Sequence, residues 1–336
     1  MNKGKILISI IIIVIVLVVV ESYVRSNINI GKQDRLFLNG TNQKILHNGQ
    51  YNPSIVDHND NFLVLSRKEN SWYMYTGINK YLPGNALTNK LKFQQNKFSV
   101  FDNNMKEVNS HILKEQGFED ERIFVHNKNI YSLSSINGRI YLNHYELSKN
   151  ELNLSQSIVV DYDENFIKNI PNKTYNKNWV YIPSDTDDMI VHTDCYPYTI
   201  IASLKINKVK AIAYLAHKNE IKPQLQSNVI SNTSNWVKWE KNKYITLVHS
   251  WTIPVKMRTK DYKTYIFEYN DDFKLVRHSR EFSLENNLFY HRIQFASGLE
   301  KFKNEEIIIT FGSGDSLSYY KIVQYTDIEN LLSVYV

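Results

Sequence analysis

The chain has 336 residues, of which 43% are hydrophobic and 22% are charged, and its formal net charge is +6 at pH 7. Its lysines are interspersed with acidic residues, whereas a nucleic-acid partner requires a clustered basic face, so we expect no nucleic-acid partner. Cys195 is the only cysteine, which excludes an intrachain disulfide. The fold must therefore depend on a packed core, which a chain of this length can supply.

The first predicted element is an apolar helix near the N terminus. Lys3 and Lys5 precede an apolar run over residues 6–20 that only Ser9 interrupts. A helix of about 15 residues rises ~22 Å, less than the roughly 30 Å of a bilayer core, but residues 22–24 extend it and lysines can snorkel to the headgroups. Since no small-residue cleavage motif follows, we predict an uncleaved membrane anchor through residues 6–24. A cleaved signal peptide is the alternative.

This anchor predicts the organisation of the whole chain. Residues 1–25 form a cytoplasmic tip and a transmembrane signal-anchor, residues 26–49 a juxtamembrane linker, and residues 50–336 the globular domain. The very short N-terminal tail favours a lumenal or extracytoplasmic domain, although basic residues stand on both sides of the apolar run. Four Asn-x-Ser/Thr sequons fit that localisation and predict glycosylation at Asn39, Asn153, Asn172 and Asn232.

After residue 35 the pattern is typical of an all-β chain. Short runs of β-branched and aromatic residues alternate with clusters of Asn, Asp, Gly and Lys. Five units, spaced by roughly 60 residues, each begin with a polar motif that leads into an apolar strand. The leading motifs are Asn52-Pro53-Ser54, Glu119-Asp120-Glu121-Arg122, Lys177-Asn178-Trp179, Ser234-Asn235-Trp236 and Gln294-Phe295-Ala296. Each unit has room for four strands, which predicts a five-bladed β-propeller; a β-sandwich would give no reason for five matching motifs.

In a propeller these motifs would mark the start of each innermost strand. We therefore expect polar side chains from several blades to converge on one funnel, which suits a hydroxyl-rich ligand such as a glycan or glycoside. The expected members are Asn52, Arg67, Asp120, Arg122, Lys177, Asn178, Asp194, His249 and Asp315. We predict no cofactor and no metal, because His192, Asp194 and Cys195 form a single cluster on one strand.

The same motifs carry a resemblance to known proteins over about residues 50–332. They are Asn52-Pro53 with Arg67, 119–122, 177–179, 247–249, 295–299 and 311–315. They resemble those of the mannoside phosphorylases and mannosidases of glycoside hydrolase family 130, and of propeller domains found with bacterial and giant-virus glycosyltransferases. The resemblance implies a propeller that acts on mannosides or related glycosides. In that family a Glu-Asp-Pro-Arg motif carries the catalytic acid, which implies that Asp120 is the proton donor.

The sequence departs from the family pattern at two places. Glu121 replaces the proline of the motif, and a carboxylate beside Asp120 would raise the Asp120 pKa, while Arg122 would lower it. The family's phosphorylases hold phosphate with arginines of the third blade, where this chain has Asn178-Trp179 and Asp194-Cys195. We therefore expect hydrolysis or glycosyl transfer rather than phosphorolysis. A non-catalytic glycan-binding propeller is the alternative, and a propeller for protein contacts is the third possibility.

Several candidates also have a purely structural interpretation. Asn52, Arg67 and Asp120 can join neighbouring blades through hydrogen bonds, and His249, at the end of an apolar strand, can be a core histidine. Three tryptophans at strand positions can stack on sugar rings or belong to the core: Trp179, Trp236 and Trp239.

Overall fold

The computed structural model describes residues 36–37, 44–48, 51–69, 94–116, 118–170, 177–207, 209–221, 230–252, 261–284, 294–313, 317–332 and 334–335. Strands dominate these residues and confirm the predicted all-β class, with two short helices, α4 (Glu164–Asn169) and α5 (Tyr325–Leu331). None of the helices described there is long and apolar enough to cross a membrane. The predicted anchor at residues 6–24 lies outside the described ranges.

The strands form five successive antiparallel meanders in the described part of the chain. The first three comprise β3 (Tyr51–His58), β4 (Asn61–Glu69), β5 (Gln94–Phe101) and β6 (Glu107–Gln116); β7 (Glu119–His126), β8 (Asn129–Ile136), β9 (Arg139–Ser148) and β10 (Glu151–Tyr162); and β11 (Val180–Ile182), β12 (Met189–Asp194), β13 (Tyr198–Ile206) and β14 (Ala211–Glu220). The fourth comprises β15 (Ile230–Asn232), β16 (Val237–Glu240), β17 (Lys243–Thr252), β18 (Asp261–Asn270) and β19 (Leu275–His278). The fifth comprises β21 (Gln294–Lys301), β22 (Glu306–Ser313) and β23 (Leu317–Gln324).

Strands from the two ends of the described chain complete these sheets. β2 (Lys44–Asn48) pairs antiparallel with β23, and β1 (Leu36–Phe37) pairs parallel with β20 (Phe282–Ser283), while β24 (Val334–Tyr335) pairs with β19. Both β1 and β2 fall within the predicted linker, residues 26–49. The sheets thus begin before residue 50, because this N-terminal segment covers the outer edge of the last meander.

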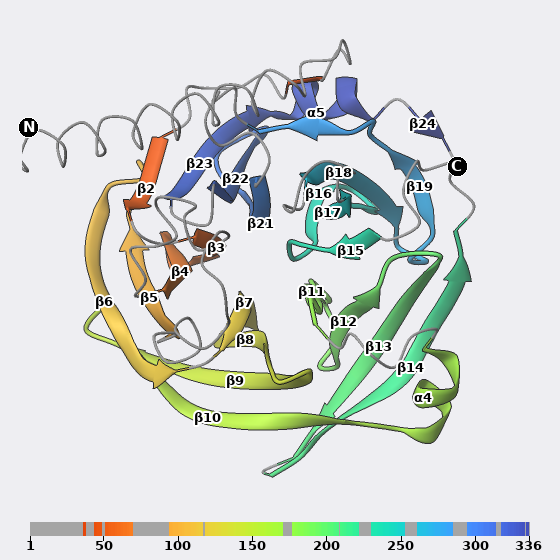
Figure 1. The fold of residues 1–336 in the computed structure, drawn as a ribbon, viewed down its shortest axis with the longest axis horizontal. Helices are drawn as coiled ribbons and strands as arrows, with labels where there is room; N and C mark the ends of the chain where they lie inside the picture. Colours follow the sequence, from red (N-terminus) through yellow and green to blue (C-terminus); the bar gives the residue numbers. More distant parts are fainter. Residues whose placement is uncertain are drawn as a thin grey trace, which may run out of the picture.

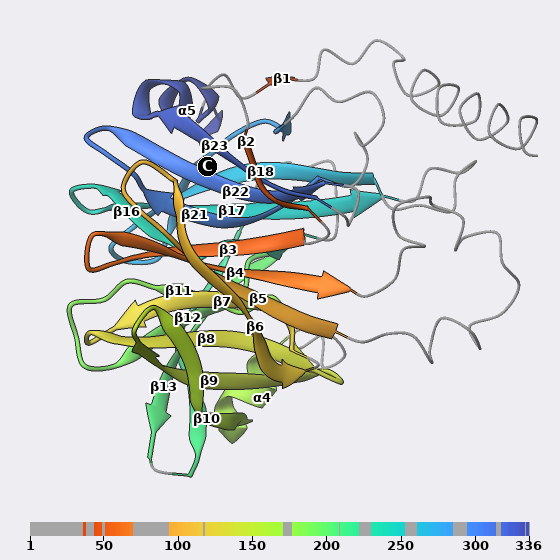
Figure 2. The same ribbon diagram turned by 90° about the vertical axis from the view of Figure 1, so that its left-hand side faces the viewer.

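The meanders lie around a common centre (Figure 1), and the inner strands run along the axis of this ring (Figure 2). This arrangement differs from the two stacked layers of a β-sandwich. A parallel pair, β10 with β14, joins the second and third meanders into one eight-stranded sheet. The innermost strand β3 packs against both β7 and β21, so the first meander touches the second and the fifth.

Each hydrophobic cluster is shared between two neighbouring meanders. Leu63 packs with Ile123 in the cluster between the first and second meanders, while the next residue, Val64, packs with Ile308 between the first and fifth. Side chains alternate between the two faces of a strand, so both faces of β4 are buried. Three further clusters fill the spaces between the second and third, third and fourth, and fourth and fifth meanders. Two-sided burial explains the continuous apolar runs in the sequence.

Candidate functional site

The leading motifs of the first two meanders form the same β-bulge. Asn52 and Pro53 together oppose one residue of β4, and Asp120 and Glu121 together oppose one residue of β8. Asn52 and Asp120 have φ angles of 51° and 50°, in the left-handed region that Asn and Asp tolerate better than most residues. A bulge bends its strand and re-aims its side chains. Asn178, which precedes β11, also has a left-handed φ of 64°.

Asp120 is the centre of a polar group formed by the first two meanders. The Asn52 Nδ2 donates to Asp120 Oδ1 at 2.8 Å, and Arg67 Nη1 lies 3.6 Å from the same oxygen. Arg67 Nη2 also lies 3.6 Å from Glu119 Oε1. The Asp120 side chain is 13% exposed and that of Arg67 14%, so this ion pair is largely removed from water. The structure thus brings together three residues that the sequence predicted for the funnel.

Electrostatics keep the Asp120 carboxyl ionised. Burial raises its pKa, but the positive charges of Arg67 and Arg122, the hydrogen bond from Asn52 and the charge of Lys177 lower it more, so that the pKa lies below its usual value. In the unliganded protein this carboxyl is therefore a charged acceptor of hydrogen bonds at neutral pH.

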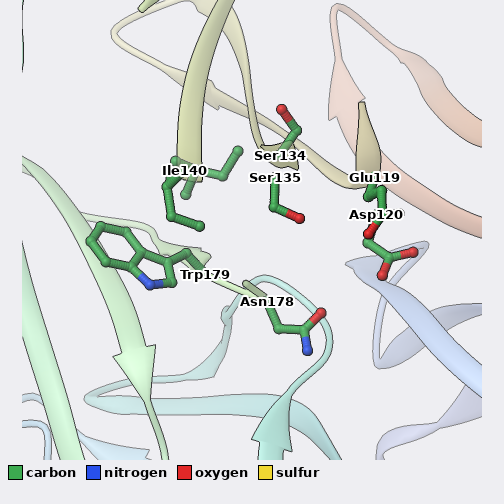
Figure 3. A pocket seen from close by; sticks show the side chains of 8 residues that line it. Glu119, Asp120, Ser134, Ser135, Ile140, Asn178 and Trp179 are labelled. Atoms are coloured by element: carbon green, nitrogen blue, oxygen red, sulfur yellow. The ribbon is translucent and has the colours of Figure 1, made fainter. Parts of the chain in front are cut away.

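A small polar pocket lies beside Asp120, between the second and third meanders. Figure 3 shows Asp120 on one side of this space and Ile140 and Trp179 on the other. Its lining comprises Glu119, Asp120, Leu133, Ser134, Ser135, Ile140, Asn178 and Trp179. This space is a narrow crevice, because five of its lining residues are themselves buried: Leu133, Ser134, Ser135, Ile140 and Trp179.

Arg122 does not line this pocket as predicted. It is fully buried, and its Nε donates to the main-chain oxygen of Thr233 at 2.6 Å while its Nη1 donates to that of Asp120 at 2.8 Å. Its guanidinium lies over the ring of Phe295, 5.6 Å from the centroid. These interactions hold the guanidinium inside the protein, while Arg122 Nη2 is buried without a hydrogen-bond partner among the described residues, so a contact between Arg122 and substrate stays a prediction.

His249 is also buried, with 5% of its surface exposed. It lies on β17, and its Nδ1 is 2.6 Å from the Thr233 hydroxyl. The structural interpretation, a satisfied core histidine, therefore fits better than a sugar ligand in the pocket.

Two further predicted members lie at the same end of the ring. The register of β11 with β12 places Asp194 at the end where Asn178 precedes β11. The Asp194 carboxylate accepts from the amide of Tyr196, and burial raises its pKa to about 6. Lys177 is exposed and acts on Asp120 through its charge. Asp315 lies outside the described residues.

The Glu121 carboxyl lies in a different environment from that of Asp120, surrounded by side chains of β5, β8 and β9. It is 4% exposed, and its Oε1 accepts from Ser132 at 2.6 Å, Tyr145 at 2.6 Å and Asn143 at 3.1 Å. Its Oε2 accepts from Asn96. Burial raises the Glu121 pKa, against the effect of these hydrogen bonds. The Asp120 pKa is lowered rather than raised, so the expected effect of Glu121 does not dominate.

The remaining predicted positions divide into three groups. Trp236 and Trp239 are buried in the hydrophobic clusters, as their core interpretation predicts, whereas Trp179 is buried but also lines the pocket. Asn153 is exposed, whereas Asn232 is 2% exposed and its Nδ2 donates to the main-chain oxygen of His192, so a glycan on Asn232 does not fit this packing. The other predicted glycosylation positions, Asn39 and Asn172, lie outside the described residues.

Sequence reasoning missed the two serines of the pocket. Ser134 opposes the Asp120 bulge on β8, and Ser135 pairs with Glu119. In the first meander, Arg67 occupies the position that Ser135 has in the second. This correspondence is visible in the sequence. When β4 and β8, the second strands of the first two meanders, are aligned, Ser135 stands at the position of Arg67.

No family profile matches the sequence, and no curated protein is similar to it in sequence. The fold is similar to that of several solved structures. The β-1,2-mannobiose phosphorylase of Listeria innocua, bound to β-1,2-mannobiose, matches with a TM-score of 0.54 and 12% identity over 87% of this chain and 93% of that chain. A glycosyl hydrolase from Bacteroides ovatus matches with a TM-score of 0.53 and 11% identity over 84% and 86%.

A third structure belongs to the GH130 family of mannoside phosphorylases, which contains glycoside hydrolases that target β-1,2 mannosidic linkages in Candida mannan. It matches with a TM-score of 0.52 and 9% identity over 88% of this chain and 93% of that chain. At such identities the matches show a common fold, and the chemistry must be argued from the residues of this chain.

The buried Glu121 predicts a pH-dependent stability. Because its pKa is raised in the folded state, its favourable contribution is complete below the unfolded pKa of about 4.3 and is lost as the pH rises through the folded pKa. We expect the stability of Glu121→Gln relative to the wild type to be higher at pH 8 than at pH 5, because glutamine is neutral at both pH values whereas Glu121 ionises as the pH rises.

Urea denaturation of both proteins at the two pH values measures this difference. Glu119→Gln is the matched control, because the Glu119 side chain is 42% exposed and should change stability little at either pH. A wild-type protein that gains stability over Glu121→Gln as the pH rises would contradict the assignment.

Proposed function

We propose that this chain is a carbohydrate-active five-bladed β-propeller that acts on mannosides or related glycosides, by hydrolysis or glycosyl transfer, with Asp120 as proton donor. The observation that carries the proposal is the buried, paired Asp120 carboxyl beside a polar pocket at the channel end, in a fold similar to that of mannoside phosphorylases. Each meander would be one blade, and the five shared hydrophobic clusters would be the interfaces between blades.

The pocket chemistry supports a sugar as ligand. Asp120 and Asn178 from two neighbouring meanders, with Ser134 and Ser135 between them, offer both donors and acceptors of hydrogen bonds. Sugar hydroxyls have the same dual character, so a sugar ring can satisfy these groups. The lining is completed by Glu119, Leu133, Ile140 and Trp179.

Proton donation requires Asp120 to change its charge state when substrate binds. In the empty site the carboxyl is ionised, because Arg67 and Arg122 outweigh its burial. A sugar that excludes the remaining water strengthens the burial effect, which favours the neutral acid. The acid can then donate its proton toward the glycosidic oxygen, directly or through a sugar hydroxyl.

A neutral acceptor fits this site better than phosphate. Arg122 is buried and donates to main-chain oxygens, while Arg67 lies between the carboxylates of Glu119 and Asp120. Lys177 is exposed near the pocket, but Glu119 and Asp120 line the pocket itself. A phosphate dianion would meet two carboxylates there, so we favour water or a sugar hydroxyl as acceptor.

A non-catalytic glycan-binding propeller is the second candidate. The lowered pKa of Asp120 favours it, because an ionised carboxylate is a good acceptor for sugar hydroxyls but holds no proton to donate.

The activity is tested with a panel of mannosides that includes β-1,2-mannobiose, with and without inorganic phosphate. We expect turnover that does not depend on phosphate and that falls by about a hundredfold or more in Asp120→Asn, within the usual range for loss of a general acid. Strict dependence on phosphate would contradict the acceptor, and full activity of Asp120→Asn would contradict the acid. If both proteins bind glycans without turnover, the second candidate is correct.

The pH profile tests the state of Asp120 independently. The protonated fraction of a carboxyl falls tenfold per pH unit above its pKa, which here lies below the usual value of about 4. The profile of kcat/KM reports groups of the free enzyme, so we expect log kcat/KM to fall with a slope of about −1 between pH ~5 and ~8. A profile that is flat or rises over this range would exclude Asp120 as the donor.

We also propose, from the sequence, that residues 6–24 anchor the chain in a membrane with the propeller in an extracytoplasmic compartment. The apolar run without a small-residue cleavage motif supports an uncleaved helix. Mass spectrometry of the protein purified from membranes should find the N-terminal segment intact. An N terminus near residue 22 or later would show that the segment is a cleaved signal peptide.

A further inference from the structure

Arg122 connects three meanders at the centre of the ring. It belongs to β7, its Nε donates to the main-chain oxygen of Thr233 in the fourth meander, and its guanidinium lies on Phe295 of the fifth. Its Nη1 returns to its own strand and donates to the main-chain oxygens of Asp120 at 2.8 Å and Glu121 at 3.4 Å. These two residues form the bulge, so the arginine clamps the backbone that carries the Asp120 carboxyl.

The bulge needs such a clamp for two physical reasons. Its extra residue interrupts the pairing with β8, which leaves main-chain oxygens without strand partners. In addition, the left-handed conformation of Asp120 costs free energy and persists only where surrounding contacts determine it. A guanidinium presents several donors in a fixed plane, so it can bind Thr233 and the bulge together, whereas the point charge of a lysine cannot.

His249 supports both contacts that hold Arg122. Its Nδ1 is 2.6 Å from the Thr233 hydroxyl, and its ring packs edge-on against Phe295 with centroids 4.8 Å apart. His249 and Thr233 are 5% and 0% exposed, and neither lines the pocket. The contacts therefore run from His249 through Thr233 and Phe295 to Arg122, and from Arg122 to the bulge.

We propose that His249 and Thr233 are positioning residues that act through Arg122 to aim the Asp120 carboxyl at the substrate. This inference rests on the proposed role of Asp120. It also predicts that activity depends on the fourth meander, although none of the described residues that line the pocket belongs to it. Neither residue touches the sugar. The histidine supplies an oriented ring and one hydrogen bond.

The test compares His249→Leu, His249→Asn and Thr233→Val with the wild type. Leucine and valine remove the hydrogen bond, whereas the asparagine amide can reach the position of Nδ1. We expect His249→Leu and Thr233→Val each to lower kcat by about tenfold or more with KM within about twofold, because a displacement of about 1 Å can cost about a hundredfold. The double variant should be no worse than either single one, and His249→Asn should recover most of the loss.

Two further measurements keep the outcome decisive. In an Asp120→Asn background, His249→Leu should leave the affinity for the best mannoside within about twofold, and a loss of tenfold or more would show that His249 contacts the sugar. In the unliganded protein, carboxyl NMR should show a higher Asp120 pKa in His249→Leu and Thr233→Val, restored in His249→Asn, since a displaced guanidinium lowers it less.

The NMR titration needs no turnover, so it separates a failure of this inference from a failure of the proposed activity. An Asp120 pKa unchanged in both variants would overturn the positioning role. His278→Leu is the control for general destabilisation, because His278, at the end of β19, is also 5% exposed and its Nδ1 lies 2.9 Å from the main-chain oxygen of Ser279. It should alter neither kcat nor the Asp120 pKa.

Discussion

The left-handed bulges at the start of β3 and β7 are the constraint on which the site depends. Each meander is buried on both faces, so a regular inner strand would direct its side chains into a hydrophobic cluster. The bulges turn Asn52 and Asp120 out of that alternation and toward each other. They also place two adjacent carboxyls in opposite environments: charges lower the pKa of Asp120, while burial raises that of Glu121. One backbone irregularity thus separates a site carboxylate from an interior one.

The sequence predicted the part of this arrangement that depends on local pattern. Runs of β-branched residues indicated the strands, and the spacing of the polar motifs indicated which strand ends meet, so Asn52, Arg67 and Asp120 were correctly grouped. The pattern could not show the role of Arg122, because an arginine in a motif of this kind can either bind substrate or hold the structure. The deciding contact is with the main-chain oxygen of Thr233, 111 residues away, and a main-chain oxygen has no signature in the sequence.

Pairing between distant strands was likewise beyond local pattern. β10 and β14 pair in parallel at residues 160–162 and 211–213, which joins two meanders into one sheet. β2 adds to β23 across nearly the whole length of the chain, although its composition resembles a polar linker. Both pairings cover an outer edge, and exposed edges are the positions that sheet proteins must protect. A short strand such as β2 is recruited by the edge that it covers, so its own residues predict it poorly.

The balance of charge at Asp120 limits which acceptors the site can use. Arg67 and Arg122 lower the Asp120 pKa only while their charges are directed at its carboxylate, and Arg122 is further committed to the bulge. The same cations cannot also neutralise a phosphate at full strength, because a second anion would have to share them with Asp120 and Glu119. A propeller that binds phosphate beside its acid needs a separate set of cations. In the described part of this chain Arg67 lies beside the carboxylates of Asp120 and Glu119, and Arg122 binds the backbone of Asp120, so under the proposed function this arrangement favours a neutral acceptor.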